Sequence, residues 1–223
     1  KSSIGLVPTQ VRSLPPALYF TMKELLIATG NAGKFQEISE ILQHLPLKLY
    51  SLKEFNLIIP ESIEDGNTYA ENSLKKARYA AQKTGLMCLA DDSGIVVDAL
   101  KDELGIMTRR WGAGSKVSDQ DWINYFLKRM ETEENRTAKF ICHAYLVDPQ
   151  GEVLYHCEGE TKGTIMHELL APIIPGLPLS SCFVAKGYDK VLAAMTVEEK
   201  NQISHRGKAI KQMKEYLQQQ LSY

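Results

Sequence analysis

Two clusters of charged residues, far apart in the sequence, carry the side chains that chemistry on a phosphorylated compound needs. The first is Asp91-Asp92-Ser93-Gly94, which follows the apolar run Leu86–Ala90. The second is Glu199–Arg206, in which a Lys, a His and an Arg fall within seven residues. Carboxylates hold divalent cations, and Lys and Arg side chains bind phosphates. The two clusters together indicate metal-assisted chemistry on a nucleotide.

The paired aspartates are expected to have different roles. Successive residues of a strand point to opposite faces, so one carboxylate is predicted to bind structural groups while the other faces a cleft. A carboxylate left without a partner in a dry core costs several kcal/mol, so a metal or a hydrogen-bond network is required. A satisfied Asx-type turn is the alternative. We place a tight turn at Asp91–Gly94, between strands at Leu86–Ala90 and Ile95–Leu100.

The second cluster places positive charge at the start of a predicted helix, where negative charge is favourable. If Ser204 is an N-cap, then His205 and Arg206 fall in the first helical turn, where free N–H groups already favour an anion. Cations at this end are unfavourable for the helix, so their presence indicates a function. The alternative is a basic turn in contact with solvent.

A glycine-containing turn near the start of the chain has the mechanics of a phosphate loop. Thr29–Lys34 follows the apolar run Leu25–Ala28 and precedes Phe35–Leu45, whose apolar residues recur at helical spacing. Glycines let backbone N–H groups approach an anion, and Lys34 adds positive charge. The segment lacks the spacing of a Walker A loop, so an ordinary strand-to-helix turn is the alternative.

A predicted helix that begins with a Thr-x-x-Glu motif lies in the sequence between the Thr29–Lys34 loop and Asp91-Asp92. It is predicted to run from Thr68 to about Thr84, with Gly85 as its C-cap. Lys76 shares a face of this helix with Asn72, four residues earlier. Ahead of the helix, Asp65 is predicted to lie in solvent, whereas Glu64 is the better candidate for a metal ligand.

The remaining patterns favour a mixed α/β fold. Helices and strands interleave without strict βαβ alternation, so a mixed sheet is expected rather than a parallel one. Further elements are predicted as strands at Leu47–Leu52, Lys139–Val147, Val153–Glu158, Gly163–Met166 and Cys182–Ala185, a hairpin turn at Asp148–Gly151, and helices at Asp121–Met130 and from Ser204 to Leu221.

Composition excludes several classes of protein. A net charge of -1 over 223 residues excludes a globally basic nucleic-acid binder, and no apolar run is long enough to span a bilayer. The four cysteines lack C-x-x-C spacing, so we expect reduced thiols and a cytoplasmic location. The histidines lack zinc-site spacing, and Trp111 and Trp122 are interpreted as core residues. Residues 1–21 are predicted to be an N-terminal extension, and 22–223 a single domain.

With these segments identified, the chain resembles the Ham1 family of inosine triphosphate pyrophosphatases, or XTP/dITP diphosphatases. Four matching blocks occur in the family's order, which is far more specific than any one block. They are Ala28–Lys34, Glu64–Asn72 with Lys76-Ala77, Ala90–Gly94 with Val97–Leu100, and Glu198–Arg206.

The resemblance implies Mg²⁺-dependent hydrolysis of deaminated purine nucleoside triphosphates, such as ITP, XTP and dITP, to the monophosphate and pyrophosphate. It implies an elongated, twisted mixed sheet with helices in two lobes around a central cleft, and a homodimer. Asp92 is the implied general base, and Glu64 and Asp92 are the implied metal ligands. The implied substrate-binding residues are Thr29, Gly30, Asn31, Ala32, Gly33, Lys34, Lys76, Ser93, Lys200, His205 and Arg206.

One block departs from the family. Where the family carries Gly-Phe-Gly-Tyr-Asp-Pro, this chain has Gly176–Phe183, in which Leu177 replaces the aromatic that stacks on the base and Ser180 replaces the acid. Loss of a stacking ring removes on the order of 1 kcal/mol of base affinity. The alternatives to the family's activity are therefore a diphosphatase with shifted base specificity and a nucleotide-binding homologue that has lost catalysis.

Overall fold

The computed structural model describes residues 24–100, 103–114 and 116–221, which form a mixed α/β fold around one six-stranded sheet. The predicted extension at residues 1–21 lies outside the described residues. The strands are β1 (Glu24–Ile27), β2 (Lys48–Ser51), β3 (Met87–Val97), β4 (Thr137–Val147), β5 (Val153–Ile165) and β6 (Phe183–Ala185). The α-helices of the described ranges are α1 (Ala32–Leu42), α2 (Tyr69–Thr84), α3 (Asp119–Arg129), α4 (Val197–Ile203) and α5 (His205–Leu221).

Short 3-10 helices occupy the connections. They are η2 (Leu52–Phe55), η3 (Glu61–Ile63), η4 (Asp98–Leu100), η5 (Gly105–Met107), η6 (Pro178–Ser181) and η7 (Leu192–Ala194). The sheet order is β2-β1-β3-β4-β5-β6, in which β1 is parallel to β2 and β3 and the other pairs are antiparallel. The mixed sheet expected from the interleaved pattern is confirmed.

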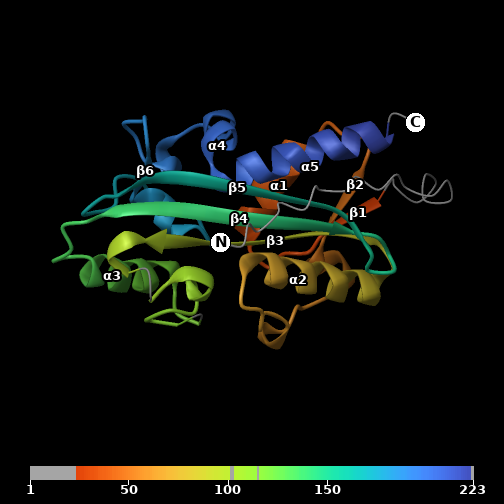
Figure 1. Ribbon diagram of the computed structural model, residues 1–223, viewed down its shortest axis with the longest axis horizontal. Helices are drawn as coiled ribbons and strands as arrows, with labels where there is room; N and C mark the ends of the chain where they lie inside the picture. Colours follow the sequence, from red (N-terminus) through yellow and green to blue (C-terminus); the bar gives the residue numbers. More distant parts are fainter. Residues whose placement is uncertain (1–23, 101–102, 115, 222–223) are drawn as a thin grey trace, which may run out of the picture.

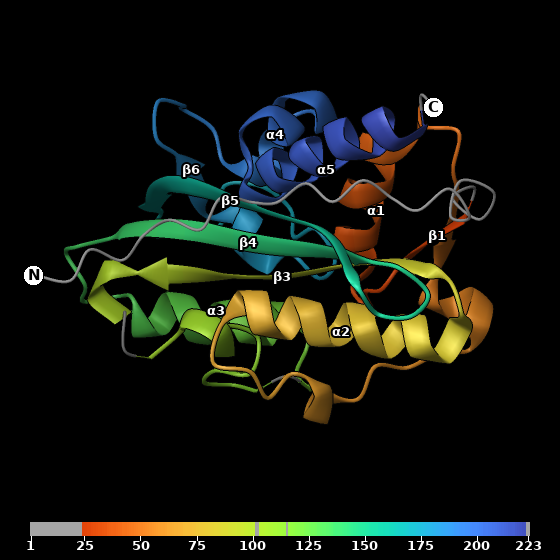
Figure 2. The same ribbon diagram turned by 45° about the vertical axis from the view of Figure 1, so that its right-hand side comes forward.

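Helices cover both faces of the long strands. Figures 1 and 2 show α1, α4 and α5 on one side of β3–β5 and α2 and α3 on the other. The alternation of side chains along the strands produces this arrangement. Leu25 and Ile27 join the core beneath α1 and α5, whereas Leu26 and Ala28 join the core against α2. A third core, at the far end of the sheet, contains Trp122 and Phe126 of α3.

The predicted turn at Asp91–Gly94 is wrong, because these residues lie inside β3. The strand runs unbroken from Met87 to Val97, and each of its residues from Cys88 to Val97 is paired with β4. The two carboxylates remain in the strand because charged partners from other elements satisfy them. Two further predicted boundaries are also corrected. Residues 98–100 form η4, and the two strands predicted at Val153–Glu158 and Gly163–Met166 are one strand, β5, which ends at Ile165.

Helix α2 begins and ends as predicted, although its N-terminus differs in one detail. The Thr68 hydroxyl accepts a hydrogen bond from the Glu71 N–H, and Gly85 ends the helix in the left-handed conformation. The Glu71 carboxylate accepts from Asn67 N instead of completing the capping box at Thr68. The helix therefore starts at the predicted residue with only half of the predicted motif.

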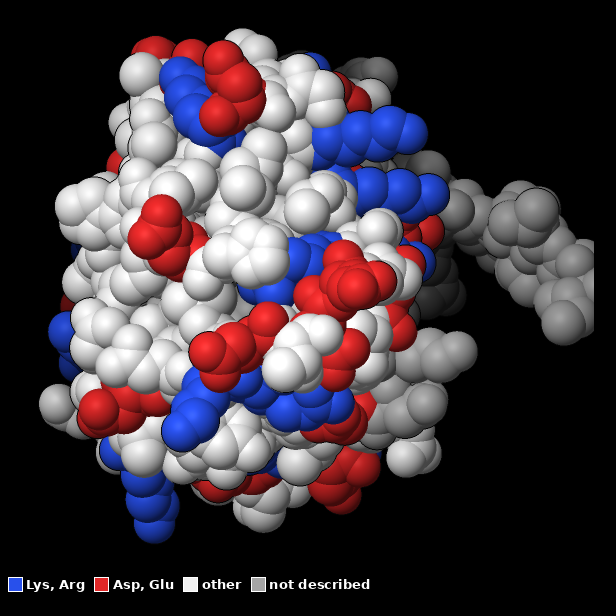
Figure 3. Space-filling view, turned by 90° about the vertical axis from the view of Figure 1, so that its left-hand side faces the viewer, with Lys and Arg blue, Asp and Glu red and all other residues white. Residues whose placement is uncertain are grey.

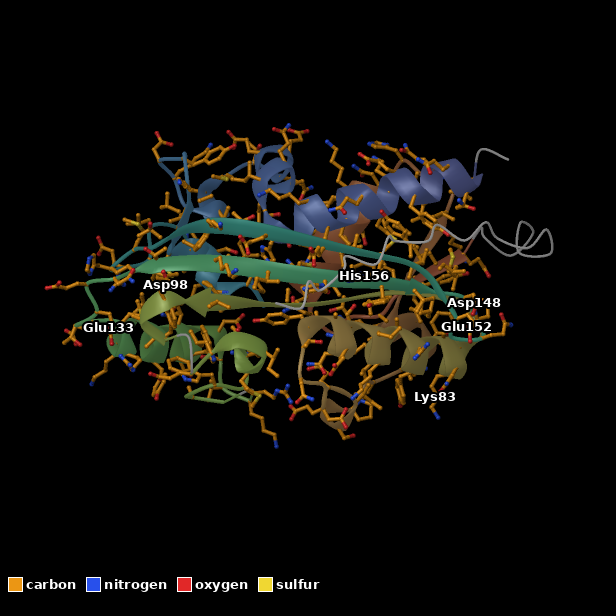
Figure 4. All side chains as sticks on the ribbon, in the orientation of Figure 1. Lys83, Asp98, Glu133, Asp148, Glu152 and His156 are labelled. Carbon is orange, nitrogen blue, oxygen red and sulfur yellow. The ribbon has the colours of Figure 1, made fainter. Side chains whose placement is uncertain are left out.

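The β4–β5 hairpin turns where predicted. Asp148 Oδ1 accepts hydrogen bonds from the N–H groups of Gln150 and Glu152, each at 2.9 Å. Figure 4 shows Asp148 and Glu152 at the tip of this hairpin, with His156 further along β5. Arg78 of α2 donates to the Gly151 carbonyl at 2.9 Å, which fixes the hairpin to that helix.

Two surface properties bear on partners. None of the helices in the described ranges combines the length and apolar composition that crossing a bilayer requires. On the face shown in Figure 3, acidic and basic side chains are interspersed. That face lacks the single-sign field with which proteins attract nucleic acid.

Candidate active site

The site lies where β1 ends and leaves one edge of β3 open. β1 pairs with β3 only as far as Ile27 and Leu89, and the chain then turns away through Thr29 into α1. Beyond this point Asp92, Ser93 and Gly94 of β3 line a cavity of about 670 Å³, which is within the usual range for small-molecule sites. Residues from both faces of the strand can therefore reach one space.

The structure brings together the site residues that the sequence predicts. All of them except Gly33 line this cavity, namely Thr29, Gly30, Asn31, Ala32, Lys34, Glu64, Lys76, Asp92, Ser93, Lys200, His205 and Arg206. Gly33 lies behind the lining, where a Cβ atom would come within 2.9 Å of the Leu177 side chain. Its lack of a side chain allows close packing between the Thr29–Lys34 loop and the segment Pro175–Leu177.

On the α2 face of β3, two carboxylates share one ammonium group. Nζ of Lys76 lies 2.9 Å from Asp92 Oδ1 and 3.1 Å from Glu64 Oε1. Burial lowers the pKa of Lys76, but Asp92 and Glu64 outweigh burial and the net shift is upward. The lysine is therefore charged at neutral pH. Its neighbours form a compact anionic pair that faces a single cationic position.

On the opposite face of β3, Asp91 is enclosed by cations. Its Oδ2 atom lies 3.1 Å from both Lys34 Nζ and Arg206 Nε, and Ser93 donates to it at 3.2 Å. Burial raises the pKa of Asp91, but Lys34 and Arg206 hold it well below its usual value. The two aspartates therefore divide as the alternation rule predicts, with Asp91 in a structural network and Asp92 lining the cavity.

The network extends to Glu37, a residue that sequence reasoning missed. Glu37 of α1 lies 2.5 Å from Lys200 Nζ and also pairs with the Arg206 guanidinium. Burial raises its pKa, yet Arg206 and Lys200 outweigh burial and lower it. These carboxylates compensate the cations at the start of α5, so the unfavourable charge noted in the sequence is balanced within the fold.

His205 is a neutral ring in the cavity wall. Burial and the adjacent Arg206 hold its pKa well below the usual value. The imidazole is stacked on Phe140, with ring centroids 4.6 Å apart and an interplanar angle of 11°. Ser204 caps α5 as predicted, since its hydroxyl accepts from Gly207 N at 3.0 Å.

Asn31 connects the Thr29–Lys34 loop to Gly176–Phe183, the segment that departs from the family pattern. Its Oδ1 atom caps α1 by accepting from Lys34 N at 3.0 Å, and its Nδ2 atom donates to the Gly176 carbonyl at 2.8 Å. The N–H of Gly176 in turn donates to Asp119 Oδ2 at 2.6 Å. Gly176 adopts a φ of 78°, and a Cβ atom there would collide with the Asn31 amide. The backbone of Gly176 is thus held at its N–H by Asp119 and at its carbonyl by Asn31.

The other end of the cavity is mostly apolar. Leu177, Pro178, Leu179 and Ser180 form one wall, and Phe140 lies among the other lining residues. Trp122 is a buried core residue, as the sequence predicts, and it also contributes to the lining of the cavity. Its position follows from α3, which packs against η6. Helical spacing identified the ring as buried but could not show what lay beside it.

Other missed residues come from segments whose partners are remote. Arg110 lines the cavity and donates to the Glu64 carbonyl at 3.2 Å, although the Arg109-Arg110 pair was visible in the sequence. Glu37 lies in an ordinary amphipathic helix and gives no local signal. In the part of the chain that the structure describes, no group of three or more His, Cys, Asp or Glu residues could hold a metal by itself.

With this geometry established, comparison with known proteins identifies relatives over nearly the whole described chain. A family model described as the Ham1 family matches residues 25–216. A dITP/XTP pyrophosphatase from Geobacter sulfurreducens is 40% identical over 198 residues, which cover 88% of this chain and 97% of that protein. A dITP/XTP pyrophosphatase from Vibrio parahaemolyticus is 38% identical, with 86% of this chain and 95% of that protein covered.

Solved structures agree with the sequence comparison. A HAM1 protein from Coxiella burnetii superimposes with a TM-score of 0.76 at 33% identity, covering 89% of this chain and all of that one. A Ham1 protein from Staphylococcus aureus gives a TM-score of 0.72 at 30% identity, with 88% and 99% covered.

Proposed function

The chain belongs to the Ham1 family, and from that premise we propose that it hydrolyses deaminated purine nucleoside triphosphates, such as ITP, XTP and dITP. The proposed products are the nucleoside monophosphate and pyrophosphate. One observation carries the proposal. The Glu64–Asp92 pair, the Thr29–Lys34 loop and the cations Lys200 and Arg206 all line one cavity. This is the composition expected of a site for a polyphosphate and a divalent cation.

The chain's own residues support binding of Mg²⁺ at the carboxylate pair. Glu64 and Asp92 both face the position of the Lys76 ammonium, so two anionic ligands already converge on one cation. Mg²⁺ is commonly bound by one or two carboxylates, with substrate phosphates and water completing its shell. The donor set fits, and Glu64 and Asp92 would hold the ion. When bound, Mg²⁺ supplies neutralisation of charge on the phosphate oxygens.

Asp92 is the proposed general base. In the reaction a water oxygen attacks the α-phosphorus, the bond from that phosphorus to the bridging oxygen breaks, and pyrophosphate leaves. Asp92 orients the water and takes its proton, a role that contributes roughly 10²–10⁴-fold in rate. The side chain is only 12% exposed, and Lys76 holds it in place. Bulk water therefore has little access to the carboxylate.

The remaining residues bind and orient the substrate. Residues at the start of α1 line the cavity, and an anion is favourable at a helix N-terminus. Lys34, Lys76 and Arg206 supply positive charge. Because Asp91 and Glu37 fix Lys34 and Arg206, their charges are already positioned before a substrate binds. Such preorganisation is a large source of catalysis in phosphoryl transfer.

Product analysis with ITP tests the proposed function. Incubation with Mg²⁺ should yield inosine monophosphate and pyrophosphate, and removal of the metal with EDTA should stop the reaction. Release of inosine diphosphate and phosphate would mean attack at the γ-phosphorus, which contradicts the proposal. Tight ITP binding without any product would favour the nucleotide-binding homologue. Turnover of other modified triphosphates instead of ITP would favour the shifted specificity suggested by Leu177.

We further propose a cytoplasmic homodimer. Cys88, Cys142, Cys157 and Cys182 are all buried and unbridged, which is usual for proteins of a reducing compartment. The homodimer rests on the family resemblance, and sedimentation equilibrium tests it directly. A mass close to twice 25.0 kDa is expected, whereas a mass near 25.0 kDa would overturn the proposal.

A further inference from the structure

Asn72 is a buried amide one turn before Lys76 on the same face of α2. Its side chain is fully buried, and its Oδ1 atom accepts a hydrogen bond from the N–H of Gly66 at 2.8 Å. Among the described residues, its Nδ2 atom has no acceptor. A buried amide with an unpaired donor is unfavourable for stability, so packing alone does not explain an asparagine at this position. The hydrogen bond that it does make lies two residues from Glu64.

Gly66 approaches α2 too closely for any side chain at position 66. A Cβ atom there would lie 2.7 Å from Asn72 Oδ1 and 2.8 Å from the Cβ atom of Glu71. The preceding residue, Asp65, has a side chain that is 70% exposed and pairs with Lys75 at the surface. Exposed ion pairs contribute little to stability. The buried contact between Gly66 and Asn72 is therefore the firmer attachment of this loop to the helix.

Three polar side chains of α2 connect the helix to both carboxylates of the candidate active site. Asn72 holds the loop that carries Glu64. Ser73 donates at 2.8 Å to a carbonyl of β3 two residues before Asp92. The ammonium group of Lys76 lies 3.1 Å or less from each carboxylate. Because these three residues belong to one helix, α2 sets the position of a loop carboxylate relative to a strand carboxylate that is remote in the sequence.

We propose that Asn72 is a positioning residue, which holds Glu64 close to Asp92 and thereby sets the affinity of this pair for a divalent cation. The inference rests on the proposed function, in which the two carboxylates hold Mg²⁺. Asn72 does not line the cavity, so it acts through the Gly66 N–H. Loss of a group that orients metal ligands by hydrogen bonding typically lowers metal affinity or activity roughly 10–100-fold.

Asn72→Ala removes the acceptor for Gly66 and leaves Glu64 itself unchanged. We expect the Mg²⁺ concentration for half-maximal ITP hydrolysis to rise about 10-fold, while kcat at saturating Mg²⁺ changes much less. Gly66→Ala should have the same effect, because its Cβ atom pushes the loop away from α2. Asn135→Ala is the matched control, since it removes an exposed amide that accepts from Thr137 N at 3.1 Å. It should leave the Mg²⁺ requirement unaltered.

Binding of Mn²⁺ without nucleotide gives a readout that does not depend on turnover. Carboxylates accept Mn²⁺ as well as Mg²⁺, and electron paramagnetic resonance measures the free Mn²⁺ in solution. Asn72→Ala and Gly66→Ala should each weaken Mn²⁺ binding about 10-fold, whereas Asn135→Ala should bind like the unaltered protein. An Mn²⁺ affinity that is equal in the unaltered protein and Asn72→Ala, or absent from both, would overturn the inference. A loss of thermal stability alone would then assign Asn72 a merely structural role.

Hydrogen exchange in the unaltered protein covers the case in which both variants fail to fold. The Gly66 N–H is buried and hydrogen-bonded, so it should exchange slowly. Addition of Mg²⁺ should slow its exchange further, because a metal on Glu64 orders the same loop. The Thr137 N–H, which is bonded to Asn135, should not respond. Exchange at Gly66 that is indifferent to Mg²⁺ would contradict the link between this contact and the metal pair.

These outcomes distinguish the inference from the proposed function. If no triphosphate yields pyrophosphate, the proposed function fails, while Mn²⁺ binding still decides whether Asn72 positions Glu64. If the unaltered protein and Asn72→Ala hydrolyse ITP with the same Mg²⁺ requirement, the inference alone is overturned.

Discussion

The two ends of the cavity are built on opposite principles. At the charged end, which we propose binds the phosphates and is termed the phosphate end, Asp91, Asp92 and Glu37 are matched by Lys34, Lys76, Lys200 and Arg206 at distances that leave the charges paired before any ligand arrives. At the base end, which Leu177, Pro178, Leu179 and Ser180 form and which we propose binds the base, the walls are largely apolar. Buried polar atoms without a hydrogen-bond partner among the described residues occur near both ends, as Nε1 of Trp122 and Oδ1 of Asp91 show.

This difference indicates which end of the cavity contributes to catalysis and which to selection of the base. Paired charges cost little reorganisation when phosphates bind, so the phosphate end is suited to lowering the reaction barrier. An apolar wall with few polar groups discriminates by shape and by those few groups, so the base end is suited to selection. Changes at the first end should mainly affect turnover and stability, and changes at the second should mainly affect the choice of base.

The largest effect is expected from Asp92→Asn. The amide keeps the shape of the side chain but cannot accept a proton, so pyrophosphate release from ITP should fall roughly 10³-fold. Steady-state assays with Mg²⁺ measure this loss. Asp65→Asn is the control, because Asp65 is exposed and pairs only with Lys75 at the surface. Near-normal turnover in Asp92→Asn would contradict the role of this residue as general base.

Glu37→Gln should have the next largest effect, on stability. It leaves the Lys200 and Arg206 charges buried with less compensation, so the free energy of unfolding should fall by about 3 kcal/mol. Urea titration measures this change. Glu199→Gln is a suitable comparison, since its pairing with Lys190 is exposed and should contribute less than about 1 kcal/mol.

The same variant should change the acid limb of the stability curve. The pKa of Glu37 is lowered in the folded protein. Its stabilising contribution is therefore complete above the unfolded-state value of about 4.3 and is lost as pH falls through the folded value. The difference in unfolding free energy between wild type and Glu37→Gln should be largest near pH 7 and shrink below about pH 4. A difference independent of pH would rule out the ion pairs as its cause.

Two alanine substitutions in the Thr29–Lys34 loop test whether packing against the base end stabilises the fold. In Gly33→Ala the new Cβ would lie 2.8 Å from the Pro175 carbonyl oxygen and 2.9 Å from Leu177, so stability should fall by about 1–3 kcal/mol. Gly30→Ala meets nothing within 4 Å and should change stability by less than about 0.5 kcal/mol. Thermal unfolding of both variants measures the pair. Equal losses would mean that Gly33 does not hold the two segments together.

The smallest effect is expected from Asn31→Ser. Serine retains the N-cap of α1 but is too short to hold the Gly176 carbonyl, so one hydrogen bond between the two ends is lost. We expect KM for ITP to rise about 5-fold with little change in kcat. Thr68→Ser, which also exchanges one capping residue for another, is the matched control. A fall in kcat with constant KM would place Asn31 in the chemistry instead.

The sequence predicted the local structure around the charged residues well, because it is encoded in short segments. The Thr29–Lys34 loop, the helix capped by Thr68 and the Ser204 cap each depend on neighbours only a few residues away. Periodicity also predicted that Asp91 and Asp92 would face different surroundings. Local rules failed at the turn expected at Asp91–Gly94, because the partners that keep these residues in a strand are Lys34, Lys76 and Arg206.

The long-range contacts at both ends of the cavity could not be predicted, because tertiary packing makes them. Glu37 lies 169 residues from Arg206 along the chain, and Asn31 lies 145 residues from Gly176. Trp122 has the spacing of an ordinary core residue, and only the packing of α3 against η6 brings it to the cavity. Long-range contacts of this kind leave no pattern in a single sequence.

The most direct test of this division is pyrophosphate release with Mg²⁺ across ITP, XTP, dITP, ATP, GTP and dUTP. If the phosphate end performs the chemistry and the base end selects, ITP, XTP and dITP should exceed ATP in kcat/KM by at least about 10-fold. Their activity should disappear in Asp92→Asn. Equal turnover of all six nucleotides would show that the base end does not select, and turnover of none would contradict the account as a whole.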